Sequence, residues 1–105
     1  MRADLCLQEL RHSTPLVQCV TNYVSMEFMA NALIALGASP AMVHANEEVI
    51  EFGALARAVL LNIGTLSEPW IQSMEKLAEA ARFLDLPCVL DPVGVGATSY
   101  RQQAC

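Results

Sequence analysis

The chain alternates between short apolar runs and longer segments with helical periodicity, and this alternation restricts the folds that it can adopt. Four apolar runs predict buried strands, at 16–20, 41–43, 59–63 and 88–90. A helical pattern at about 4–11 precedes the first run, and further helical patterns separate the others. Apolar strands separated by helices are typical of a parallel sheet that is covered on both faces. We therefore expect an α/β fold of three αβα layers with a mostly parallel sheet.

Two of the predicted helices have clear terminal signals. Asn22 is a plausible N-cap for a helix that runs to Leu36, and Gly37 stands in the usual C′ position. Apolar residues recur every three or four positions in this helix and leave little polar face, so we expect it to be buried on most sides. Ser67 opens a second helix, with an acidic residue and a proline in its first turn.

Two further expectations concern Asn46 and the cysteines. Asn46 is a candidate cap for a helix whose first turn carries Glu47 and Glu48. The four cysteines have no Cys-x-x-Cys spacing, which argues against a zinc site. Cys19 and Cys88 lie within predicted strands, where free cysteine usually acts as a small buried residue.

Composition excludes several functional classes. A net charge of −5 with scattered basic residues gives no surface for nucleic acid. No apolar run approaches the ~20 residues needed to span a bilayer, and no export signal precedes the first helix, so we expect a cytoplasmic protein without a membrane partner. The chain is 54% apolar and 16% charged, which exceeds what a small solitary domain easily buries. A larger parent fold or an oligomer is therefore implied.

Residues suited to ligand binding follow each predicted strand. In parallel α/β sheets ligands gather beyond the carboxyl ends of the strands, so these residues should share one edge. Asn22, Gly64 and Thr65 can also be explained as helix-capping and turn residues. Asp91 is a poor choice for a purely structural role, and we favour a functional one. The pair Gly94-x-Gly96 matches a dinucleotide-binding fingerprint only weakly, because the third glycine is absent.

Taken in order, four segments resemble the hydroxyethylthiazole kinase family of the ribokinase-like superfamily. They are 13–22 (STPLVQCVTN), 36–43 (LGASPAMV), 62–66 (NIGTL) and 90–98 (LDPVGVGAT). The resemblance implies the N-terminal portion of a ribokinase-like fold. It also implies ATP-dependent phosphorylation of 4-methyl-5-(2-hydroxyethyl)thiazole in thiamine biosynthesis and salvage, with Mg²⁺, by a homotrimer.

The resemblance assigns roles to individual residues. Met42 matches a methionine that contacts the thiazole, and Asn22 matches an asparagine of the same pocket. Gly64 and Thr65 match a turn at the pocket edge. Asp91 matches an acidic residue near the phosphate and Mg²⁺ region. A thioether beside a sulfur heterocycle, and an amide beside its nitrogen or hydroxyl, are chemically reasonable.

Members of this family are usually much longer than this chain. Residues 1–105 are therefore expected to form the N-terminal part of a single domain, with the nucleotide-binding part and the catalytic cysteine loop outside them. No catalytic residue is assigned within the chain, and the chain alone is expected to be inactive. The alternative is a non-catalytic module for thiazole binding or subunit association. A redox-type nucleotide-binding protein is a third reading, disfavoured by the incomplete glycine pattern.

Overall fold

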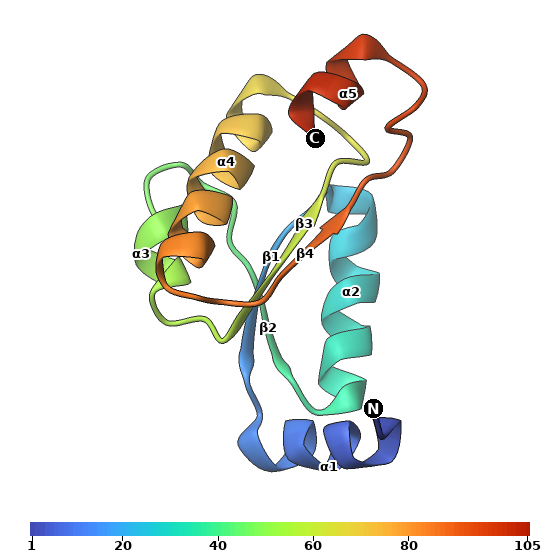
Figure 1. The fold of residues 1–105 in the computed structure, drawn as a ribbon, viewed down its shortest axis with the longest axis vertical. Coiled ribbons are helices and arrows are strands. Elements are labelled where there is room, and N and C mark those ends of the chain that lie inside the picture. Colours follow the sequence, from blue (N-terminus) through green and yellow to red (C-terminus); the bar gives the residue numbers. More distant parts are fainter.

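The computed structural model describes residues 1–105, which form a four-stranded sheet between layers of helices (Figure 1). All neighbouring strands are parallel, and their order across the sheet is β2-β1-β3-β4. The strands are β1 (Leu16–Val20), β2 (Ser39–Met42), β3 (Ala58–Asn62) and β4 (Cys88–Asp91). The predicted α/β class is therefore confirmed, and only the second strand begins clearly earlier than its apolar run suggested.

Helices cover the two faces of the sheet. They are α1 (Ala3–Ser13), α2 (Tyr23–Leu36), α3 (Val49–Gly53), α4 (Glu68–Phe83) and α5 (Ser99–Ala104). Helix α4 packs on β3 and β1 with α3 beside it, whereas α2 packs on β2 from the other side (Figure 1). No helix combines the length and the apolar character needed to cross a bilayer.

The core lies between the sheet and α4. Its eight buried residues are Val20, Val49, Val59, Leu61, Ile63, Met74, Leu77 and Ala81. Helix α4 contributes Met74, Leu77 and Ala81 to this core, whereas Leu84 lies past the end of the helix and is exposed. Burying a side chain as large as leucine contributes about 1.5–3 kcal/mol to the free energy of unfolding. Packing on this face of the sheet therefore supplies most of the hydrophobic stabilisation.

The predicted caps of α2 and α4 form. The side chain of Asn22 accepts a hydrogen bond from the backbone N–H of Ser25 at 3.1 Å. Ser67 accepts one from the backbone N–H of Trp70 at 3.4 Å. Gly37 adopts a left-handed conformation with φ of 110°, and a side chain there would also collide with Arg11. These local signals were sufficient because each involves residues close in sequence.

The expected burial of α2 is wrong. None of its residues is buried, and Val24 and Phe28 remain 92% and 74% exposed. The helix packs on the edge strand β2 and touches α1, so one narrow side is covered and the rest faces outward. Periodicity shows how apolar a helix is, but not how many neighbours the fold supplies for it.

The predicted cap at Asn46 is also wrong. Residues 46–48 form a turn, and α3 begins only at Val49, so Glu47 and Glu48 precede the helix. The side-chain amide of Asn46 instead donates to the carbonyl of Pro69 at 3.2 Å. A contact with the start of α4 has therefore replaced the local cap.

The two strand cysteines differ. Cys19 in the central strand β1 is fully buried, and burial raises the pKa of its thiol to about 11. Cys88 is exposed because β4 is an edge strand, which corrects the expectation that both are core residues.

Candidate functional site

The carboxyl ends of the four strands form one edge of the sheet, towards the top of Figure 1. The register aligns these ends, since Cys19 pairs with Met42 and Asn62 pairs with Asp91. Asn22 follows the end of β1, and Gly64 and Thr65 follow the end of β3. The predicted gathering of strand-end residues is thus a property of the fold.

Gly64 lies where two asparagine side chains meet. A Cβ atom at this position would come within 2.8 Å of Oδ1 of Asn62 and within 2.9 Å of Nδ2 of Asn22. The backbone N–H of Gly64 donates to that same Oδ1 atom at 2.7 Å. Asn22 therefore caps α2 with its oxygen while its nitrogen faces Gly64. Its interpretation as a helix cap is thus compatible with its interpretation as a residue of the binding pocket.

Asn22 and Thr65 line one cavity at this edge, with a volume of about 270 Å³. Its other walls are Tyr23, Val24, Ser67 and Trp70. Small-molecule sites combine apolar or aromatic walls with a few polar groups, and start at about 300 Å³. The cavity matches this description in composition, and its volume is slightly below this range.

An aromatic cluster adjoins the cavity and joins three separate segments. The rings of His44 and Trp70 stack with centroids 4.1 Å apart, and Tyr23 meets both rings edge-on. The indole N–H of Trp70 donates to the carbonyl of Thr21 at 2.8 Å. Sequence analysis missed this cluster. The available signal was the position of Trp70 in the first turn of a helix that follows a strand end.

Met42 ends the outer strand β2 at the same carboxyl edge of the sheet, but it is not part of the cavity wall. The loop that follows it is held by buried side chains. The amide of Gln18 donates to the carbonyls of Val43 and Val49, at 3.2 and 3.1 Å, and the hydroxyl of Ser73 bonds to the carbonyl of His44. Gln18 thus fixes the chain beyond Met42.

Asp91 stands one strand away from Gly64. Its carboxylate accepts a hydrogen bond from the side-chain amide of Asn62 at 3.2 Å, and the residue is exposed. No cluster of three or more histidine, cysteine or acidic side chains forms anywhere in the chain. A single accessible carboxylate suits Mg²⁺ when phosphate oxygens and water complete the coordination.

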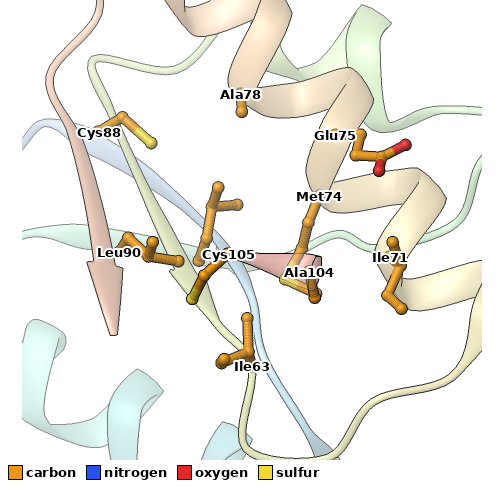
Figure 2. A pocket seen from close by; sticks show the side chains of 10 residues that line it. Ile63, Ile71, Met74, Glu75, Ala78, Cys88, Leu90, Ala104 and Cys105 are labelled. Carbon is orange, nitrogen blue, oxygen red and sulfur yellow. The ribbon is translucent and has the colours of Figure 1, made fainter. Parts of the chain in front are cut away.

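A second cavity, of about 380 Å³, lies between α4 and the strands β3 and β4 (Figure 2). Side chains such as Ile63, Met74 and Leu90 point into it, and nine of its ten lining residues are hydrophobic. Without converging polar groups it resembles an incompletely filled core. The strand-end edge is therefore the candidate site.

The fold is that of an α/β protein with a candidate small-molecule site at the carboxyl edge of a parallel sheet. A family model described as the hydroxyethylthiazole kinase family matches residues 7–105. The chain belongs to the hydroxyethylthiazole kinase family.

Relatives and a solved structure agree with this assignment. The hydroxyethylthiazole kinase of Leptothrix cholodnii is 53% identical over 104 residues, which are 97% of this chain and 37% of the relative. That of Leptospira biflexa is 57% identical over 98 residues, or 93% of this chain and 37% of the relative. The structure of a hydroxyethylthiazole kinase protein from Pyrococcus horikoshii superposes with a TM-score of 0.93 at 52% identity. It covers 95% of this chain, which spans 39% of that structure.

Proposed function

We propose that this chain supplies the thiazole-binding side of an ATP-dependent kinase that phosphorylates the hydroxyl group of 4-methyl-5-(2-hydroxyethyl)thiazole in thiamine biosynthesis and salvage. The observation that carries the proposal is the meeting of Asn22, Gly64 and Thr65 at the carboxyl edge of the sheet, beside an aromatic-walled cavity. Membership of the hydroxyethylthiazole kinase family supports the substrate class.

The side chains suggest a division of roles in binding. Tyr23 and Trp70 offer aromatic surface to a planar heterocycle, and Asn22 and Thr65 offer polar groups to its nitrogen or its hydroxyl. Gly64 keeps the turn free of a side chain that would displace Asn22. The role of Met42 rests on the family resemblance, because its thioether lies outside the cavity wall.

Asp91 is the proposed acidic residue of the phosphate and Mg²⁺ region. Asn62 holds one carboxylate oxygen of Asp91, which fixes the orientation of the group. Mg²⁺ bound with ATP would neutralise charge on the phosphates during transfer. We assign no catalytic residue within this chain.

We further propose that residues 1–105 are the N-terminal part of a single kinase domain, and that this chain alone does not transfer phosphate. The chain spans about 37% of the relatives that it matches, and phosphoryl transfer depends on many positioned groups. A homotrimer and a cytoplasmic location are proposed on the family resemblance.

Binding of the thiazole alcohol tests the site directly. Trp70 is the only tryptophan and lines the cavity, so its fluorescence should report saturable binding to the purified chain. Asn22→Asp keeps the oxygen that caps α2 but removes the amide donor, so we expect affinity to fall about tenfold with helix content unchanged. Asn31→Asp, at an exposed position of α2 outside the cavity, is the matched control. Absence of saturable binding by the unchanged chain would contradict the proposed thiazole site.

A second candidate function is subunit association without catalysis. The exposed apolar side chains of α2, Val24 and Phe28 among them, favour it, because such surface is typical of protein interfaces. Size-exclusion chromatography with light scattering distinguishes the candidates. An association module requires a defined oligomer, and a polydisperse mixture would count against it.

A further inference from the structure

Three backbone carbonyls converge on the guanidinium group of Arg101. Its Nη1 atom donates to the carbonyls of Ile63 and Val93, both at 2.7 Å, and its Nη2 atom donates to that of Gly64 at 2.9 Å. Two of these carbonyls belong to the turn after β3, and the third belongs to the turn after β4. One side chain therefore bridges two turns at the edge of the sheet that holds the candidate site.

Asn62 connects the same turns through its own side chain. Its oxygen accepts from the N–H of Gly64 at 2.7 Å, and its nitrogen donates to the carboxylate of Asp91 at 3.2 Å. Asn62 thus binds the N–H of Gly64, and Arg101 binds its carbonyl. The backbone of Gly64 is thus held from two directions.

The local structure around Arg101 fixes its position. Arg101 lies in the first turn of α5, where the hydroxyl of Thr98 caps its backbone N–H at 3.1 Å. Its side chain passes Gly94, where an added Cβ would lie 3.4 Å from Cδ. Gly94 has a φ of 68°, a conformation that favours glycine. The turn after β4 is therefore shaped to admit this side chain.

We propose that Arg101 and Asn62 are positioning residues that fix the positions of Gly64 and Asp91 relative to each other at the candidate site. The importance of this arrangement for binding rests on the proposed function. The hydrogen bonds that connect the two turns do not depend on it. Arg101 is not part of the cavity wall, so it acts through the two turns. A guanidinium presents several donors in a planar fork, and a lysine ammonium is a single point that does not reach three carbonyls in this way.

Removal of the guanidinium provides the test. In Arg101→Ala of the full 105-residue chain, we expect amide hydrogen exchange at Gly64 to accelerate about tenfold or more, and the side-chain amide resonances of Asn62 to shift. Amides of β1 should keep their protection. Added methylguanidinium should restore the Gly64 signal, because it fits the space that the alanine variant vacates.

Two variants separate the connection from general effects of charge. Arg101→Lys keeps the charge and should restore little protection at Gly64, whereas Arg82→Ala, at an exposed position late in α4, should change nothing. Unchanged exchange at Gly64 in Arg101→Ala would overturn the proposal. Full restoration by lysine, or an equal loss of protection throughout β1, would overturn it as well.

Titration of the same variants with the thiazole alcohol tests the positioning role. If the unchanged chain binds, Arg101→Ala should weaken binding about tenfold, and methylguanidinium should reverse the loss. Equal affinity in both chains would overturn the positioning role. If the unchanged chain does not bind while Gly64 still responds to the variant, the proposed function fails and the connection between the turns stands.

Discussion

Gly64 has no side chain, and the amides of Asn22 and Asn62 occupy the space that one would need. Both amides are already engaged, one as the cap of α2 and the other between Gly64 and Asp91. Any rearrangement to admit a larger residue must therefore break hydrogen bonds. This coupling explains why a single small residue matters for both stability and the candidate site.

Replacing Gly64 with Ala should lower the free energy of unfolding by about 1–3 kcal/mol, because the new methyl group displaces one or both asparagine side chains. Urea unfolding followed by circular dichroism measures the change. Gly96→Ala is the matched control, since a Cβ there meets nothing within 4 Å. Equal stability of the two variants would contradict the explanation.

Cys19 should make the stability of the fold sensitive to alkaline pH. Burial raises the pKa of its thiol from 9.0 to about 11, so between these values the unfolded chain loses a proton that the folded chain keeps. The free energy of unfolding therefore falls as pH rises through this window, and the contribution of Cys19 is fully present below pH 9.

Cys19→Ala should remove the contribution of Cys19 to this dependence, about 1 kcal/mol per pH unit within the window. Burial also raises the pKa of the Cys88 thiol, so a smaller slope of the same sign should remain. Urea unfolding at several pH values below and above pH 9 measures this dependence. Cys6→Ala, at an exposed position, should retain the slope of the unchanged chain. A slope in Cys19→Ala as steep as that of the unchanged chain would assign the effect to other groups.

At the scale of elements, the start of α4 organises the loop after β2. Asn46 bonds to the carbonyl of Pro69, the ring of His44 stacks on Trp70, and the carbonyl of His44 accepts from Ser73. Helix α4 thus covers the core with one side and holds the chain beyond Met42 with its first turns. The position of that loop is a consequence of helix packing.

Ser73→Ala should lower the free energy of unfolding by about 1–3 kcal/mol, because it removes the donor to the carbonyl of His44. Ser73 is fully buried, so water does not readily replace the lost bond. Ser13→Ala removes an exposed hydrogen bond from the hydroxyl to the carbonyl of Glu9. It should lower the free energy of unfolding by less than about 0.5 kcal/mol. Thermal unfolding of both variants gives the comparison, and equal effects would exclude a special role for the loop contact.

At the scale of the whole molecule, apolar surface is distributed unevenly. Helix α2 exposes Val24 and Phe28, and the edge strand β4 exposes Val89 and Leu90. Unpaired strand edges and contiguous apolar surface both promote association between chains. The solution behaviour of this chain should therefore depend on these two surfaces.

The double variant Val24→Lys with Phe28→Lys should reduce self-association while leaving the urea midpoint nearly unchanged, because neither side chain contributes to the core. Light scattering as a function of concentration measures the association. Substitution of Glu47 and Glu51 with glutamine, also at exposed positions, produces the same change in net charge and is the matched control. If both double variants associate equally, charge rather than the surface of α2 controls association.

Sequence by itself determined the class of fold, the strands, the caps at Asn22 and Ser67 and the edge at which strand-end residues gather. These features depend on periodicity and on contacts within a few residues. The tertiary structure decided the partners of residues far apart in the chain: Trp70 bonds to Thr21 across 49 positions, and Arg101 bonds to Ile63 across 38. It also decided the exposure of α2, because burial depends on which surfaces the folded chain brings together.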